Sequence, residues 1–257
     1  MISKTYCPLP FNHLYITPSN SVKVCCAFRK DIEDEGVSLL KEYKNLSDHF
    51  NHPFIKDIQQ KMLSGEKVAG CERCYYFEEH APGKSMRQVF IDTWHTERFN
   101  LSPPDVDNPK LEFLEMAFGN YCNLACRTCG SNLSHSWIED EKKLTRLGIT
   151  TQEGNMKRVN VERKWQDDDL KDLRYLKVTG GEPMLHPDFY KFVEKLNPSK
   201  IFLEIYTNAS WIPKKKLLDT LSKFKFCAIF LSVDGTGTVQ EYMRHNAKWN
   251  ITEDSTR

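Results

Sequence analysis

The sequence predicts an α/β fold with parallel strands, preceded by a small, loop-rich part that carries several cysteines. After Pro109, strand-like and helix-like runs alternate, which is typical of parallel strands joined by crossover helices. Before Pro109 the strand-like runs are short and turn residues are frequent. Three prolines and several acidic or amide residues gather in 101–109, so we expect two domains, 1–105 and 106–257.

The first domain is expected to contain a hairpin and two helices. His13–Thr17 and Val22–Cys26 alternate in hydrophobicity around a Pro-Ser-Asn turn, as the strands of a hairpin do. A helix is expected to begin near Pro53, which the first turn tolerates, and to end at Gly65. Its inner face is expected to carry Ile55, Ile58 and Met62. A second helix is expected over Ser85–Arg98.

The second domain is expected to hold four strands. They are Leu111–Phe118, Leu173–Thr179, Ile201–Thr207 and Phe226–Val233. The expected helices are Asn132–Leu147, Pro187–Leu196, Pro213–Phe224 and Thr236–His245. The polar stretch Gly148–Asp169 is interpreted as an insertion, and Asn246–Arg257 as a polar tail without a fifth strand.

Composition excludes several classes of function. Lys and Arg number 36 against 35 Asp and Glu, which leaves no basic surface for nucleic acid or an anionic membrane. No apolar stretch approaches the ~20 residues that span a bilayer, and the N-terminus lacks the apolar core of a secretion signal. We therefore expect a cytoplasmic, reducing location. Nine cysteines there indicate metal ligands rather than disulfides.

The most informative cysteines are Cys122, Cys126 and Cys129, which are spaced CxxxCxxC. Iron–sulfur clusters normally take four cysteines, so three local thiolates leave one iron of a [4Fe–4S] cluster open to another ligand. Gly180–Pro183, Asn208 and Ser232–Asp234 also follow strand-like runs. Because the carboxyl ends of parallel strands meet at one edge, we expect these segments to converge there.

These four motifs, in this order, resemble those of the radical S-adenosylmethionine (radical SAM) superfamily. Gly180-Gly-Glu-Pro183 resembles its GGEP loop, Thr207-Asn208 its Thr-Asn pair, and Ser232-Val-Asp-Gly235 its SxDG strand end. One departure is Thr128, where the family usually has an aromatic residue beside the adenine. The family's barrel commonly has about six strand–helix units. The resemblance therefore implies an incomplete parallel β/α barrel. We expect a chain truncated at its C-terminus; the alternative is a naturally open barrel that a partner completes.

The resemblance also implies the chemistry of this second domain. Cys122, Cys126 and Cys129 would hold the catalytic [4Fe–4S] cluster. S-Adenosylmethionine (SAM) would bind its open iron and be cleaved reductively to a 5′-deoxyadenosyl radical, which abstracts hydrogen from a substrate. The implied SAM-contacting residues are Gly180, Gly181, Glu182, Pro183, Asn208, Ser232 and Asp234. Among them, Glu182 would meet the ammonium group of SAM.

The early cysteines resemble the auxiliary-cluster module called SPASM or, in its shorter form, twitch. The matching residues are Cys7, Cys25, Cys26, Cys71 and Cys74, and the likeness continues at Glu78 and Ser85-Met-Arg87. This implies a second [4Fe–4S] cluster with four thiolate ligands. The adjacent pair Cys25 and Cys26 leaves two choices for one ligand; the pattern favours Cys25. A structural zinc site is the alternative reading of these cysteines.

Family analogy suggests a peptide or protein substrate, or else a small molecule, and an electron donor such as flavodoxin or ferredoxin. The alternative function is a non-catalytic iron–sulfur or zinc-binding interaction protein with a degenerate barrel. Cys227 lies in a strand-like apolar run and is expected to be a buried hydrophobic residue rather than a ligand.

Overall fold

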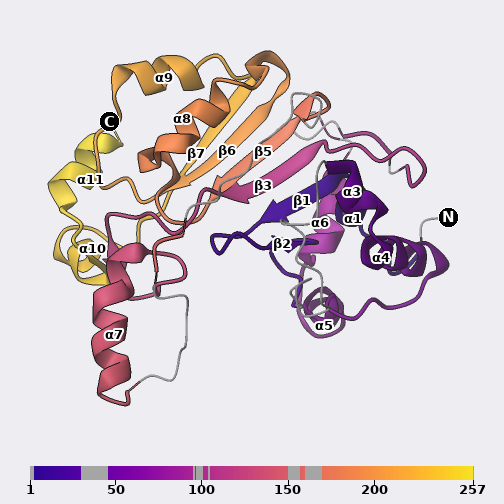
Figure 1. The fold of residues 1–257 in the computed structure, drawn as a ribbon, viewed down its shortest axis with the longest axis horizontal. Coiled ribbons are helices and arrows are strands. Elements are labelled where there is room, and N and C mark those ends of the chain that lie inside the picture. The colour runs from indigo at the N-terminus through magenta and orange to yellow at the C-terminus, as the bar shows by residue number, and fades with distance from the viewer. Residues whose placement is uncertain are drawn as a thin grey trace. The chain divides into compact units, whose positions relative to one another are not determined.

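The chain folds into two compact units in the computed structural model (Figure 1). The structure describes residues 3–29, 46–94, 96, 101–103, 105–149, 157–159 and 170–256. The first unit comprises Met1–Ile16, Ser21–Glu115 and Lys164–Leu176, and the second Thr17–Asn20, Met116–Arg163 and Lys177–Arg257. The domain boundary expected at residues 105 and 106 stays a prediction. None of the helices in these described ranges is both long and apolar enough to cross a membrane.

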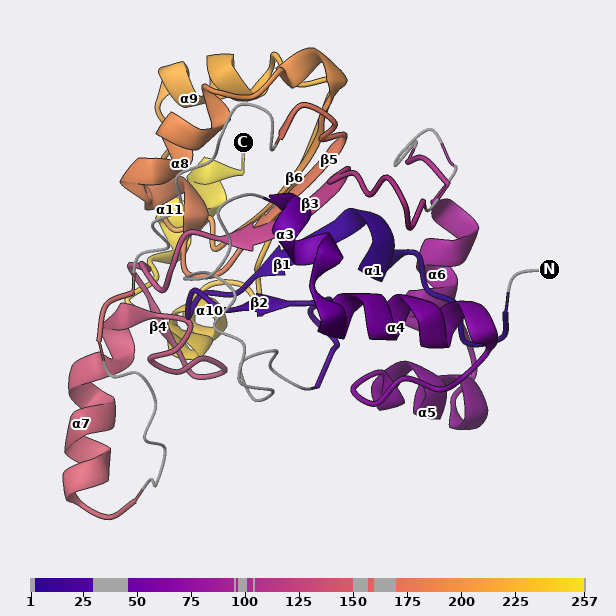
Figure 2. The ribbon, with the colours of Figure 1, turned by 45° about the vertical axis from the view of Figure 1, so that its right-hand side comes forward.

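The first unit is built on a hairpin and several short helices. Its elements are α1 (Leu9–Asn12), β1 (His13–Ile16), β2 (Val22–Lys23), α3 (Leu46–Asn51), α4 (Pro53–Ser64), α5 (Glu72–His80) and α6 (Met86–Thr93). Strands β1 and β2 pair antiparallel, with Tyr15 opposite Lys23, so the predicted hairpin is confirmed. Helices α4 and α5 are neighbours in both views (Figure 1, Figure 2).

Local capping explains the limits of the two predicted helices in this unit. In α4, Pro53 takes the first position and Gly65 ends the helix with φ 87°, a left-handed conformation that glycine adopts without steric cost. The predicted inner face is confirmed, because Ile55, Ile58 and Met62 are all buried. Helix α6 begins after Ser85, whose hydroxyl accepts a hydrogen bond from the Gln88 N–H in a capping box. The helix ends at Thr93, short of the predicted Arg98: Trp94 and Thr96 are described and are not helical, while 95, 97 and 98 lie outside the described residues.

The second unit contains alternating strands and helices. Its strands are β3 (Phe113–Ala117), β4 (Ala125–Cys126), β5 (Tyr175–Thr179), β6 (Phe202–Thr207), β7 (Phe226–Leu231) and β8 (Arg244–His245), of which β3 and β5 also have residues in the first unit. Its helices are η2 (His135–Trp137), α7 (Ile138–Arg146), η4 (Pro183–Leu185), α8 (Pro187–Val193), η5 (Pro198–Lys200), α9 (Lys215–Leu221), α10 (Thr238–Met243) and α11 (Trp249–Ser255). Each of the four predicted strands contains an observed one, and each of the four predicted helices contains an observed α-helix.

The main sheet has the order β2-β1-β3-β5-β6-β7, and β4 pairs with β8 in a separate two-stranded sheet. Strands β6 and β7 run parallel, with Phe202 opposite Phe226. Helices α8 and α9 lie side by side next to these two strands (Figure 1, Figure 2). The predicted α/β class with a mostly parallel sheet is therefore confirmed.

The predicted polar tail differs from expectation, whereas the predicted insertion lies mostly outside the described residues. Of the predicted insertion Gly148–Asp169, only Gly148, Ile149 and 157–159 are described. The segment interpreted as a polar tail forms α11, in which Thr252 is buried. Strand β7 ends the sheet with Phe226, Ile229, Phe230 and Leu231 each at least 40% exposed.

Candidate functional site

The three CxxxCxxC cysteines line one cavity of about 260 Å³ in the second unit. Cys126 lies in β4, while Cys122 and Cys129 occupy the loops on either side of it. Cys122 and Cys126 are buried, and Cys129 is half-buried. The same cavity is lined by five residues of the other motifs: Gly180, Gly181, Thr207, Asn208 and Ser232. The structure thus brings together the segments that the sequence predicted to converge.

Electrostatics within this cavity favour thiolate at one of the cysteines. Burial raises the pKa of Cys122. Cys126 and Cys129 share a hydrogen bond that raises the pKa of Cys126 and lowers that of Cys129. Because the thiolate is the form of cysteine that binds metals, the lowered pKa of Cys129 favours metal binding at this pair.

Residues 242–244 hold one side of the cysteine loop. The sequence analysis did not predict this contact. Strand β4 pairs with β8, which sets Cys126 opposite Arg244. Arg127 adds a backbone bond from its N–H to the Met243 carbonyl at 2.9 Å, and its guanidinium stacks over the Tyr242 ring. The loop is therefore fixed by residues more than a hundred positions away.

Arg244 is the charged residue of this segment that reaches the cavity. Its Nη1 lies 3.9 Å from the Cys126 Sγ, and its Nε lies 2.9 Å from the Asp234 carboxylate. Asp234 is thus paired with an arginine, and it is not among the residues that line the cavity. No sequence motif had marked Arg244, because its place depends on the two-residue pairing of β4 with β8.

Asn120 holds the other side of the cysteine loop, and the sequence analysis did not predict this role either. It is fully buried; its Nδ2 donates to the carbonyls of Ser131 and Lys157, at 2.8 and 3.0 Å, and its Oδ1 accepts from the Val159 N–H at 2.8 Å. The next turn is fixed by His135, whose Nδ1 accepts the Cys122 N–H at 3.1 Å. The described part of the predicted insertion is therefore bonded to the cysteine loop.

The two glycines of the GGEP loop are required by the backbone itself. Gly180 and Gly181 have φ of 75° and 56°, in the left-handed region. A Cβ on Gly181 would collide with the carbonyl oxygen of Tyr121, which already accepts the Glu182 N–H at 2.6 Å. The loop therefore packs its backbone directly on the residue before Cys122, and side chains are excluded at this contact.

We expect Gly181→Ala to lower the free energy of unfolding by at least about 1–2 kcal/mol, the cost of left-handed backbone for a residue with a Cβ, with the collision at Tyr121 adding to it. Thermal denaturation followed by circular dichroism measures this. Gly83→Ala is the matched control, since Gly83 also has positive φ but nothing within 4 Å of an added Cβ. Equal losses for the two variants would show that the close contact is unimportant.

Glu182 follows the cavity-lining Gly181 but does not itself line the cavity. It is fully buried, and its carboxylate accepts hydrogen bonds from the Asn208 N–H at 2.7 Å and the Thr207 hydroxyl at 2.8 Å. Burial raises the pKa of Glu182. In this arrangement Glu182 positions Asn208, whose Nδ2 lies 3.6 Å from the Cys122 Sγ. The predicted contact of Glu182 with an ammonium group stays a prediction, as does any ligand contact of Pro183, which is buried in η4.

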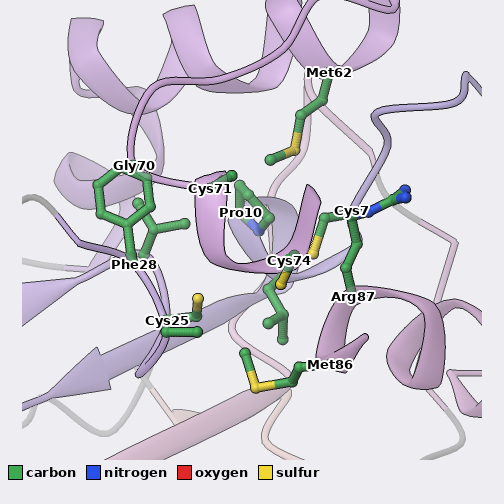
Figure 3. Close-up of a pocket in the computed structure, with 13 residues that line it drawn as sticks. Cys7, Pro10, Cys25, Phe28, Met62, Gly70, Cys71, Cys74, Met86 and Arg87 are labelled. Atoms are coloured by element: carbon green, nitrogen blue, oxygen red, sulfur yellow. The ribbon is translucent and has the colours of Figure 1, made fainter. Parts of the chain in front are cut away.

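Four of the early cysteines line a second cavity, which lies in the first unit (Figure 3). Cys7 precedes α1, Cys25 follows β2, and Cys71 and Cys74 lie at the start of α5. The remaining wall is mostly apolar: Leu9, Pro10, Val24, Ala27, Phe28, Met62 and Met86. Burial raises the pKa of Cys7 and Cys25 and that of Cys71 to about 12.

Cys26 does not line this second cavity. Its side chain is exposed, and its Sγ lies 3.8 Å from the Met86 Sδ. The structure thus distinguishes the adjacent pair, placing Cys25 with the other three thiols. Among the described residues, no three His, Cys, Asp or Glu side chains are arranged to hold a single metal ion. A four-iron cluster has a different requirement, because each of its thiolates binds a separate iron.

Comparison with known proteins agrees with these motifs. The family model described as the Radical SAM superfamily matches residues 116–256. A crystal structure of Streptococcus suis SuiB bound to S-adenosylmethionine is similar at 19% identity and a TM-score of 0.34, over 57% of this chain and 29% of that one. No curated protein matches the chain. Because the family match covers more than half of the sequence, this chain belongs to the radical SAM superfamily.

Proposed function

We propose that the second unit is the core of a radical SAM enzyme, with Cys122, Cys126 and Cys129 as ligands of a [4Fe–4S] cluster and SAM at the open iron. The observation that carries the proposal is the cavity of about 260 Å³ lined jointly by these three thiols and by Gly180, Gly181, Asn208 and Ser232. Among the residues that line this cavity there is no fourth cysteine, which suits a cluster with one open iron. Family membership supports both cofactors.

When bound, a reduced cluster and SAM supply a one-electron cleavage that yields methionine and a 5′-deoxyadenosyl radical able to abstract hydrogen from a substrate. The protein positions the residues around the cysteine loop and brings a positive charge to it. Arg244 brings a cation to the Cys126 Sγ, which opposes the rise in the pKa of Cys126 that its hydrogen bond with Cys129 causes. Glu182 fixes the Asn208 backbone, and Asn208 in turn donates to the Asn123 side chain at 2.8 Å, at the edge of the cysteine loop.

For the first unit we propose a second [4Fe–4S] cluster held by Cys7, Cys25, Cys71 and Cys74. The donor set fits such a group, because four thiols line one largely apolar cavity and buried iron–sulfur clusters are held by four thiolates. We keep the division into an auxiliary module, 1–105, and a radical SAM core, 106–257. A peptide or protein as substrate, and flavodoxin or ferredoxin as electron donor, are proposed by family analogy.

The test is anaerobic reconstitution of the full chain with iron and sulfide, followed by dithionite and SAM. We expect about eight irons per chain, from two four-iron clusters, and formation of 5′-deoxyadenosine. Iron without 5′-deoxyadenosine would favour the non-catalytic iron–sulfur protein, and a chain that takes up no iron would refute the proposal. The substrate is then sought as a compound whose hydrogen appears in the 5′-deoxyadenosine.

A second candidate occupant of the first unit's cavity is a structural zinc ion. The observation that favours it is the small volume of this cavity, about 20 Å³, because a zinc ion needs far less room than a cluster; the thiols would have to move closer together to bind one ion. Metal analysis of the Cys126→Ala variant separates the two candidates. Zinc without iron there would assign the cavity to zinc and would leave the proposal for the second unit standing.

A further inference from the structure

A buried cation lies at the cavity of the first unit. Arg87, in α6, lines this cavity together with the four thiols, and its side chain is only 8% exposed (Figure 3). Its Nη1 donates to the Tyr6 carbonyl at 2.7 Å, on the residue just before Cys7. The guanidinium is thus fixed at the cavity by the same segment that supplies the first cysteine.

Glu78, in α5, holds the other side of this guanidinium. Arg87 donates from Nε to the Glu78 Oε1 at 2.9 Å and from Nη2 to Oε2, so that the pair is bidentate. Glu78 also accepts from the Ser85 hydroxyl at 2.5 Å. Planar two-point pairing of this kind fixes the orientation of the arginine as well as its charge.

A metal centre bound in this cavity would place negative charge next to the Arg87 guanidinium. Four thiolates outweigh the positive charge of either a four-iron core or a zinc ion, so the loaded site is a net anion in an apolar surrounding. A buried charge is costly unless an opposite charge compensates it.

We propose that Arg87 is the counter-ion of this metal site and that Glu78 limits how much of its charge the site experiences. The inference rests on the proposed auxiliary cluster and adds the residues that set its charge balance. Arg87 acts here as a positioning residue, since it acts on the metal centre through the field at the thiolates and is not itself a ligand. Because reduction adds an electron to an already anionic site, the cation favours the reduced form.

The experiment measures the midpoint potential of the auxiliary cluster by redox titration with electron paramagnetic resonance. The Cys126→Ala background removes the signal of the other cluster. We expect Arg87→Met to disfavour reduction about tenfold, a shift of about 59 mV to lower potential for one electron. Glu78→Gln is expected to move the potential in the opposite direction, because the arginine is then no longer neutralised. A merely structural role would not produce shifts of opposite sign.

Lys84→Met is the matched control, because it also removes a positive charge but from a side chain that is 65% exposed and paired with Asp92. Water screens that charge, so we expect little change in potential. Should Arg87→Met not fold, the double variant Arg87→Met, Glu78→Gln leaves no unpaired charge, and Arg87→Lys keeps the charge without the bidentate pair. Potentials that are equal in wild type, Arg87→Met and Glu78→Gln would overturn the inference.

Failure of the proposed cluster gives a different result. If the Cys126→Ala protein holds zinc, the charge argument predicts about tenfold faster zinc loss to a chelator from Arg87→Met, in line with the 10–100-fold effect of residues that support metal ligands. Equal rates of zinc loss would contradict the counter-ion role. A site that binds neither iron nor zinc refutes both the proposed cluster and its counter-ion.

Discussion

Replacement of Cys126 by alanine is expected to reduce 5′-deoxyadenosine formation by more than about 100-fold, since even residues that only support a metal ligand contribute about 10–100-fold. Cys126 is the central thiol of the loop, buried in β4 between the other two. Iron is expected to fall from about eight to about four per chain, one cluster being lost. Iron analysis and 5′-deoxyadenosine assays on the same reconstituted sample measure both effects.

Cys227→Ala provides the matched control for this variant. Cys227 lies in β7 and lines neither of the two cysteine cavities. We expect it to keep wild-type iron content and activity. If Cys126→Ala instead loses all iron, the two sites are not independent and the two-cluster proposal is wrong. If it cleaves SAM as well as Cys227→Ala does, Cys126 is not a ligand.

Elements whose signals lie within a few residues could be predicted from the sequence. Helix α4 is one example, because Pro53 and Gly65 mark its ends through backbone conformation alone. The hairpin of β1 and β2 is another, since the turn between two alternating runs fixes their pairing. The expectation for Cys227 was only partly right: it lies in a strand but is half-buried, because β7 is at the edge of the sheet.

Parts of the site that depend on distant pairings could not be predicted. Arg244 reaches Cys126 only because a two-residue strand pairs with β4, and runs of two residues carry no periodic signal. Asn120 is a polar residue before a motif, and nothing local shows that 157–159 returns to bond with it. Helix α11 is polar in sequence and is held in place by tertiary contact, as the bond between the Ser255 hydroxyl and the Ala209 carbonyl at 2.6 Å indicates.

The residues of the GGEP loop have structural roles that the motif alone did not indicate. The sequence interpretation assigned Gly180 and Gly181 to close approach of a ligand. In the structure the positive φ values of both residues and the contact of Gly181 with Tyr121 already require glycine, independently of any ligand. Glu182 likewise bonds to Thr207 and Asn208, which links two of the predicted motifs to each other. Such links between motifs cannot be read from one segment at a time.

The adjacent pair Cys25 and Cys26 offers the sharpest test of the first unit. We expect Cys25→Ala to weaken metal binding there by more than about 100-fold, because it removes a ligand rather than a residue supporting one. Cys26→Ala is expected to retain the metal, since its thiol is exposed and lies outside the cavity. Both are measured as metal per chain after gel filtration, in the Cys126→Ala background that isolates this site.

The two variants each remove one thiol, from adjacent residues. A difference in their metal content therefore reflects where each thiol lies and not the loss of a cysteine as such. Cys25 and Cys26 lie beyond β2 and Val24, where the chain turns and the Phe28 N–H donates to the Cys25 carbonyl at 3.2 Å, and only Cys25 lines the cavity. Metal loss in Cys26→Ala with retention in Cys25→Ala would assign the ligand to the exposed thiol. Loss in both would mean that the pair acts together, and the four-thiol site would have to include Cys26.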